Sequence, residues 1–207
     1  MALPTYDKSK RRKSNFEALP KDAYVVRIMN AKEVPYQNGT GSCISMAFDI
    51  AEGEYKDFYK KQFEGNTNED KKWPFDAVFR LGIPDDNSEN WKWDNWNSFF
   101  ADLEDSNNGF RFQGDPASIK GKLIGGKFHI EQTEGTDRNG NHRIYNHTRL
   151  KWTCVAEDVR KGKAGTLPYD KLISGDSADA QQNTMQTTPD GFVKIPDSAT
   201  EEEIPFD

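Results

Sequence analysis

Apolar and polar residues alternate along several stretches of this chain, most clearly along residues 121–159. This stretch predicts two strands, GKLIGGKFHIEQT and NHRIYNHTRLKWTCVAEDV, joined by a turn that contains an Asn-Gly pair. Asn-Gly between alternating apolar residues is a strong hairpin signal. We expect a three-residue loop, Arg138-Asn139-Gly140, with the glycine in the left-handed conformation. This register sets Phe128 opposite Leu150, whereas a slip of one residue would mix apolar and charged side chains on both faces.

The register predicts two different faces for the hairpin. The apolar face consists of Ile124, Phe128, Ile130, Ile144, Leu150, Trp152 and Cys154. The other face sets Lys127, His129 and Glu131 across from Lys151, Arg149 and His147, with Tyr145 opposite Thr133. Cations beside an aromatic residue suit nucleic-acid binding, although a solvated face is the commoner fate of such residues. We therefore carry Lys127, Tyr145, Arg149 and Lys151 forward as candidate contacts.

Further strands are predicted upstream of the hairpin. Alternation indicates strands at residues 23–34 and 42–50, and a third at 54–63 with aromatic residues and lysines on both faces. A short helix is expected at 74–81. A longer helix is expected from about 89 or 94 to 104, with a buried stripe of Trp96, Phe99, Phe100 and Leu103. Trp91 and Trp93 near its start suit packing or base stacking.

This order of elements predicts a mainly β domain over residues 20–160. Five strands with a helical insertion between strands three and four match the OB-fold, a small Greek-key barrel. In that fold the oligonucleotide face lies over strands two and three and over the loops joining strands one to two and four to five. On these elements the candidate DNA contacts are Tyr36, Tyr55, Tyr59, Lys60, Lys61 and Arg138.

The two ends of the chain differ from the body. Residues 1–19 form a basic arm, which is either a solvated tail or an electrostatic contact with nucleic acid. Residues 161–207 lack any sustained period, so we expect a disordered acidic tail. Positions 165–207 hold nine acids and two lysines, a net charge of −7, so the rest of the chain carries +1 although the whole carries −6. Cys43 and Cys154 lie on predicted core strands and are expected to be buried free thiols.

Particular motifs then point to a family. Glu201, Glu202, Glu203, Ile204, Pro205 and Phe206 resemble the acidic, Ile-Pro-Phe-terminated tail of bacterial single-stranded-DNA-binding proteins. The body is similar to a family of phage-encoded OB-fold proteins found with replication and recombination genes. That similarity rests on the segments Leu19-Pro20-Lys21-Asp22-Ala23-Tyr24, Gly53-Glu54-Tyr55-Lys56-Asp57 and Leu123 to Ile130.

The resemblance implies sequence-independent binding and protection of single-stranded DNA. It also implies that residues 201–206 recruit replication and recombination proteins, with the Phe side chain and the chain-end carboxylate docking in a basic pocket. Here Asp207 follows Phe206, which displaces that carboxylate by one residue. A disordered acidic tail can also compete with DNA for the protein's own basic groove. A purely solubilising tail would not need Ile204, Pro205 and Phe206.

The sequence disfavours an enzyme. The three histidines, His129, His142 and His147, lie on the last hairpin without a third metal ligand at a suitable spacing, and no nucleophile or phosphate-loop motif is present. We therefore expect no cofactor and no metal. No 18-residue apolar run or signal peptide occurs, so we expect no membrane span and a cytoplasmic location, the host cytoplasm if the protein is phage-encoded.

Several alternatives stay open at this stage. A phage protein-interaction or scaffold module without nucleic-acid binding is the main one. RNA stays open as a ligand because base stacking accepts either sugar, whereas duplex DNA is disfavoured because no helix with a basic face is predicted. The sequence leaves the oligomeric state open, including a homo-oligomer.

Overall fold

The structure is a computed structural model that describes residues 18–39, 41–66, 70–137 and 139–173. These residues all belong to one of the two units into which the chain divides, Met1–Ile173. Most of the predicted N-terminal arm, the predicted DNA contact Arg138 and the predicted partner-binding tip at 201–206 lie outside the described residues. No helix in the described part of the chain is long and apolar enough to cross a membrane.

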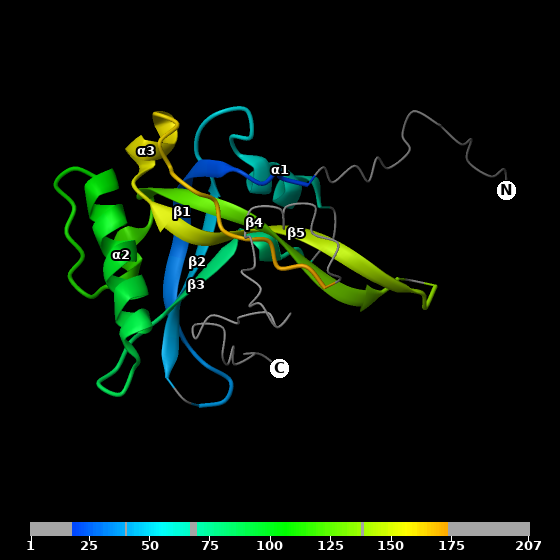
Figure 1. Cartoon of the computed structure of the whole chain (residues 1–207), viewed down its shortest axis with the longest axis horizontal. Coiled ribbons are helices and arrows are strands. Elements are labelled where there is room, and N and C mark those ends of the chain that lie inside the picture. The colour runs from blue at the N-terminus through cyan, green and yellow to red at the C-terminus, as the bar shows by residue number, and fades with distance from the viewer. Residues whose placement is uncertain (1–17, 40, 67–69, 138, 174–207) are drawn as a thin grey trace, which may run out of the picture. The chain divides into compact units, whose positions relative to one another are not determined.

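Five antiparallel strands form one sheet, in the order β3-β2-β1-β4-β5 (Figure 1). The prediction of a mainly β domain is therefore confirmed. Among the described residues β3 and β5 share no backbone ladder, so the sheet is open between them. The strands are β1 (Ala23–Pro35), β2 (Ser42–Ile50), β3 (Val78–Gly82), β4 (Leu123–Thr136) and β5 (His142–Cys154). The helical elements are α1 (Phe58–Gly65), η2 (Phe75–Ala77), α2 (Asn90–Ser106), η3 (Pro116–Ile119) and α3 (Ala156–Arg160).

The main hydrophobic core lies on one side of this sheet, and a smaller cluster of Val25, Ala51 and Ala156 is separate from it. Successive strand residues point to opposite faces, and the apolar positions of β1 and β2 alternate accordingly. Helix α2 supplies Phe99, Phe100 and Leu103 to the same core, and Trp96 packs against it, which confirms the predicted helical stripe. From the strands, the most deeply buried members of the core are Val26, Ile28, Ile44, Met46, Phe48, Ile50, Ile124 and Phe128.

The predicted hairpin register is confirmed along most of its length. Phe128 pairs with Leu150, and the pairing continues in step to Thr136 and His142. Gly140 has a φ of 83°, the left-handed conformation that the three-residue loop requires.

At the base of the hairpin the register shifts between Lys127 and Phe128. Lys127 pairs with Trp152 and not with Lys151, which becomes the extra residue of a β-bulge. The bulge moves Trp152 and Cys154 to the face opposite Phe128, so their predicted place on the apolar face is wrong. Cys43 and Cys154 are nevertheless buried free thiols, as predicted.

The predicted third strand at 54–63 is wrong, because these residues form a turn followed by α1. The buried carboxylate of Asp49 on β2 accepts the backbone N–H groups of Tyr59 and Lys60 at 2.9 and 3.1 Å, and so caps the first turn of the helix. Burial raises the pKa of Asp49, although three backbone hydrogen bonds act in the opposite direction. The helix turns Tyr59 inward against Phe48, where it is 2 % exposed.

The third strand of the sheet is formed by residues predicted to be helical. Only Phe75–Ala77 form a single 3₁₀ turn, and Val78–Gly82 then pair with β2. Helix α2 follows β3 and precedes β4 in the chain.

Residues 169–173, which fall within the tail expected to be disordered, pack along β4 instead. Lys171 exchanges backbone hydrogen bonds with Ile130 and Gln132 at 2.9 and 2.8 Å, in a parallel bridge at Glu131. Asp170 accepts from the Ile130 N–H and forms an ion pair with Lys21 at 3.0 Å. The segment thus lies along the edge of β4 beyond Lys127, where the pairing of β4 with β1 stops. The folded unit therefore extends past the predicted boundary at residue 160.

Candidate nucleic-acid interface

Two cations without a partner among the described residues lie on the outer face of β1, β2 and β3. Lys32 pairs with Ser45 across β1 and β2, and Ser45 pairs with Arg80 across β2 and β3, so the three side chains form one row on the same face. Their neighbours Ala31, Met46 and Leu81 point into the core. Both cations are exposed, and neither has a hydrogen-bond or ion-pair partner within the described residues. We call Lys32, Ser45 and Arg80 the cationic row.

Tyr36 lies beside this row. Backbone hydrogen bonds of 3.0 Å from Tyr36 N to Gly41 O and from Gly39 N to Tyr36 O close the loop between β1 and β2. The Tyr36 hydroxyl lies 3.1 Å from the point that a Cβ on Gly82 would occupy. Because glycine has no side chain, the tyrosine ring can approach the end of β3 at Gly82. Of the residues predicted to contact DNA, Tyr36 is the one beside the cationic row.

The negative charge near the row is largely satisfied within the protein. Asp49 pairs with Arg27 across the strands, but its carboxylate is buried and accepts hydrogen bonds from the N–H groups of α1. Glu33 accepts a hydrogen bond from Ser42 Oγ at 2.6 Å. Arg27 itself is exposed. The face over β1 to β3 therefore presents more cation than anion to a ligand.

Sequence reasoning missed Lys32 and Arg80. The sequence pattern predicts a short helix at residues 74–81, which includes Arg80. The apolar-polar alternation of Phe79-Arg80-Leu81 is nevertheless typical of a strand. Lys32 lies within a correctly predicted strand, but a lone lysine there carries no signal until its neighbour across the sheet is known.

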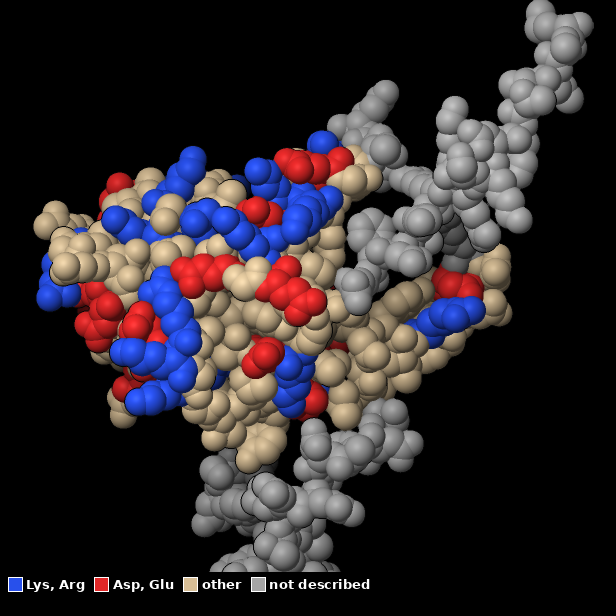
Figure 2. All heavy atoms as spheres, turned by 90° about the horizontal axis from the view of Figure 1, so that it is seen from above, with Lys and Arg blue, Asp and Glu red and all other residues tan. Residues whose placement is uncertain are grey.

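Most candidates from the predicted third strand lie elsewhere. Tyr59 is in the core, and Tyr55 packs edge-on against Tyr24 with ring centroids 5.8 Å apart. Lys60 and Lys61 are exposed on α1, with the Lys60 ammonium 3.9 Å from Glu64 and the Lys61 ammonium donating to a backbone carbonyl. Figure 2 looks onto the side that carries α1 and α3, and the basic side chains there alternate with acidic ones.

The candidate strip on the hairpin is neutralised at its centre. Arg149 donates to Asp76 at 3.2 Å and to Glu131 at 2.8 Å, and its guanidinium lies over the Phe75 ring, 4.5 Å from the centroid. Lys171 adds a further ion pair to Glu131 at 3.4 Å. Burial alone would raise the pKa of Glu131, but the two cations hold it below its ordinary value. Arg149 is thus a structural ion-pair partner in this conformation.

The other hairpin candidates are more accessible. Tyr145 is 40 % exposed and its ring lies across Gly135, about 3.0 Å from the position of a Cβ on that glycine. Lys151 is exposed at the bulge, next to Trp152, which is 44 % exposed. Lys127 pairs with Trp152 across the strands and is only partly exposed. Lys127, Lys151 and Trp152 thus lie at the base of the hairpin, and Tyr145 lies nearer its tip.

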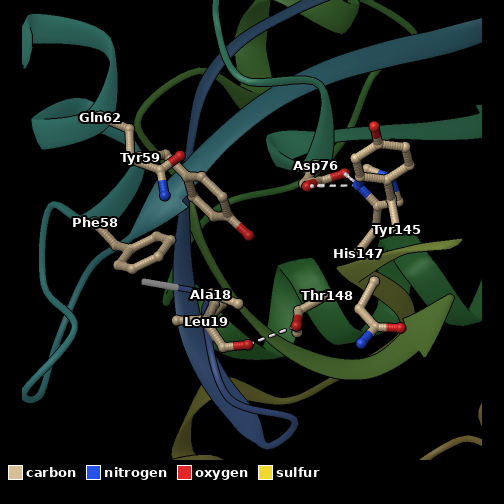
Figure 3. A pocket seen from close by; sticks show the side chains of 10 residues that line it. Ala18, Leu19, Phe58, Tyr59, Gln62, Asp76, Tyr145, His147 and Thr148 are labelled. Atoms are coloured by element: carbon tan, nitrogen blue, oxygen red, sulfur yellow. Dashed lines mark hydrogen bonds and ion pairs between the residues drawn. The ribbon is translucent and has the colours of Figure 1, made fainter. Parts of the chain in front are cut away.

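A cleft of about 240 Å³ lies where β3 and β5 fail to pair, between α1, η2 and β5 (Figure 3). Asp76 bridges the gap through hydrogen bonds to His147 Nδ1 at 3.1 Å and to Arg149. His147 Nε2 lies 3.1 Å from Thr133 Oγ1, which fixes the imidazole. Side chains therefore take the place of a backbone ladder at this edge.

The described residues contain no group of three or more His, Cys, Asp or Glu side chains placed to hold a metal ion. No known protein-family model matches the chain, and no curated protein sequence is significantly similar to it.

Proposed function

We propose that this chain binds single-stranded DNA without sequence preference and without catalysing a reaction. It protects exposed strands during phage DNA replication and recombination, and it recruits partner proteins through the acidic tip at residues 201–206. The observation that carries the proposal is the cationic row on the outer face of β1 to β3, with Tyr36 beside it.

The strand order supports an OB-fold as the frame for this activity. An OB-fold is a five-stranded, partly open Greek-key barrel. The order β3-β2-β1-β4-β5 is that of such a barrel opened between β3 and β5. Asp76, just before β3, reaches His147 and Arg149 of β5 across the opening. The oligonucleotide face of this fold lies over strands two and three, which carry Ser45 and Arg80, and Lys32 on the neighbouring β1 borders it.

The chemistry of the face suits a single strand. Proteins that bind single strands combine cations along the phosphates with aromatic rings that stack on bases, each stack contributing about 1–3 kcal/mol. Lys32 and Arg80 supply the first component and Tyr36 the second. On the hairpin, Tyr145 extends the same chemistry toward the loop between β4 and β5, the other loop that borders the ligand face in this fold. Lys151 adds a cation at the base of the hairpin.

A second candidate function is a protein-interaction module without nucleic-acid binding. It is favoured by Ile144, which is 45 % exposed beside Tyr145 on the part of the hairpin that extends beyond the core (Figure 1). Exposed apolar residues on such a hairpin also suit contact with another protein.

Fluorescence anisotropy of a labelled oligo-dT strand, compared with a duplex of equal length at two salt concentrations, tests the proposal. We expect tight, salt-sensitive binding of the single strand and weak binding of the duplex. Equal affinity for strand and duplex would contradict the preference, and absence of binding to both would favour the protein-interaction module.

A further inference from the structure

The cleft between α1, η2 and β5 contains a buried polar atom that has no partner in the part of the chain that the structure describes. Tyr59 is 2 % exposed, and its hydroxyl has no hydrogen-bond partner among the described residues. Burying a hydroxyl without a hydrogen bond is costly. In Figure 3 the Tyr59 ring enters the cleft from the side of α1, and its hydroxyl points toward the space between Asp76 and Thr148. A tyrosine held in this way suggests that the missing partner is a ligand.

We propose that this cleft receives one unstacked nucleobase of the bound single strand and contacts its Watson–Crick edge. The inference rests on the proposed function and extends it to a particular site. Two chemical properties of the cleft point to a base: its hydrogen-bonding groups and its aromatic walls.

The hydrogen-bonding groups fit all four bases. A carboxylate only accepts, whereas a tyrosine hydroxyl both donates and accepts. Asp76 accepts from an N–H on the base, and Tyr59 donates to a neighbouring ring nitrogen or carbonyl. Every base presents an N–H beside such an acceptor on its Watson–Crick edge, so the site does not discriminate by sequence. The same edge is occupied in a duplex, so the cleft favours single strands.

The walls of the cleft suit a flat ring. Phe58 lines one side and Tyr145 lies on the side of β5 (Figure 3). Bases removed from a stack are commonly held between aromatic or apolar side chains and hydrogen-bonded on this edge. Tyr145 is 40 % exposed and can rotate to widen the mouth, since side-chain rotamer changes at interfaces are common.

The charge of the cleft argues against a cationic peptide side chain as the occupant. The carboxylate of Asp76 already faces Arg149, and Glu131 on the same network is paired with Arg149 and Lys171. Two acids and two cations balance, so the site offers no net negative charge to a lysine or arginine. A neutral polar ring fits this balance better.

The test is Tyr59→Phe, which removes only the hydroxyl, with Tyr24→Phe as the matched control. Tyr24 also packs against the core, but its hydroxyl donates to Pro20 O at 2.9 Å. The thermal midpoint of the free protein should stay the same or rise in Tyr59→Phe and fall in Tyr24→Phe. A clear fall in Tyr59→Phe would mean that the hydroxyl has a structural partner, and would overturn the inference.

Binding is then measured with an oligonucleotide of about eight nucleotides, within the usual range for one OB-fold, and with versions in which each base in turn is replaced by an abasic site. Tyr59→Phe should bind the intact strand about 3- to 10-fold more weakly than the wild type, the effect of one hydrogen bond. The salt dependence should not change. On the strand lacking the inserted base, the two proteins should bind equally.

The outcomes separate this inference from the proposed function. If wild-type protein binds the strand and Tyr59→Phe binds it equally well, the base site is wrong and the proposed function stands. An equal weakening on the intact strand and on every abasic strand would show that the hydroxyl acts through the structure, and would also overturn the site. If the wild type binds no single strand, the proposed function fails and the base site fails with it.

Discussion

The most direct prediction concerns the two unpaired cations of the row. We expect the double variant Lys32→Gln/Arg80→Gln to bind oligo-dT with a weaker salt dependence than the wild type. Both residues are exposed and unpartnered among the described residues, so their replacement should leave the thermal midpoint of the protein unchanged.

The magnitude follows from counterion release. For single strands, the logarithm of the binding constant falls with the logarithm of salt concentration with a slope of about −0.7 per neutralised phosphate. Two lost contacts should therefore reduce the slope by about 1.4. If the affinities of variant and wild type meet near 1 M salt, the variant binds about 25-fold more weakly at 0.1 M salt.

The assay is anisotropy of labelled oligo-dT over a salt series, with Lys92→Gln/Lys120→Gln as the control. The control removes the same charge from exposed residues that lie outside β1 to β3, on α2 and after η3. Its slope should stay close to that of the wild type, because neither lysine belongs to the cationic row and neither would contact a phosphate bound there. An unchanged slope in Lys32→Gln/Arg80→Gln, or an equal reduction in both double variants, would refute the assignment of the interface to this face.

Three further predictions concern the fold and the tail. Gly125→Ala should lower the free energy of unfolding in urea by about 1–3 kcal/mol, because the new Cβ would lie 2.8 Å from the Cys154 carbonyl oxygen. The control is Gly65→Ala, whose Cβ would meet nothing within 4 Å. This control should change the free energy of unfolding by less than about 1 kcal/mol. Glu131 has a lowered pKa, so its stabilising effect is present above its ordinary pKa and is lost as the pH falls through the lowered folded value. The stability gap between wild type and Glu131→Gln in thermal scans should therefore shrink in acid, and a gap independent of pH would contradict this. Removal of residues 201–207 should leave oligo-dT affinity equal or higher and abolish partner capture, and a clear loss of affinity would count against competition by the tail.

The hairpin shows how far local sequence determines structure here. Asn139-Gly140 and the alternating apolar residues define both the loop length and the pairing, so the register followed from the sequence. The bulge at Lys151 did not, because Leu150, Trp152 and Cys154 still alternate in the sequence across it. An extra residue changes which face they occupy without changing their pattern.

The segment after β2 shows the opposite case. Residues 54–63 alternate well enough to resemble a strand, but the start of α1 is capped by Asp49, about ten residues earlier in the chain. That contact is tertiary, so no window around Tyr59 contains its signal. The same holds for residues 169–173, which are held by hydrogen bonds to β4.

The candidate interface was only partly predictable for a related reason. The sequence shows how many cations a strand carries. Whether a cation is free to bind a phosphate depends on the acidic side chains that the fold places beside it. Arg149 is matched by Asp76 and Glu131, whereas Arg80 has no partner among the described residues. Only the tertiary contacts of each arginine distinguish a structural one from one able to bind a phosphate.

The open edge of the sheet and the proposed base site have a common physical origin. A backbone ladder would bring β3 and β5 within about 4.8 Å of each other and would leave no space between them. Asp76 joins them through side-chain contacts to His147 and Arg149 instead. Partly exposed ion pairs of this kind contribute little to stability, about 0–1 kcal/mol each. A base can therefore enter the gap without breaking regular secondary structure, and it would give the Tyr59 hydroxyl the hydrogen-bond partner that it lacks among the described residues.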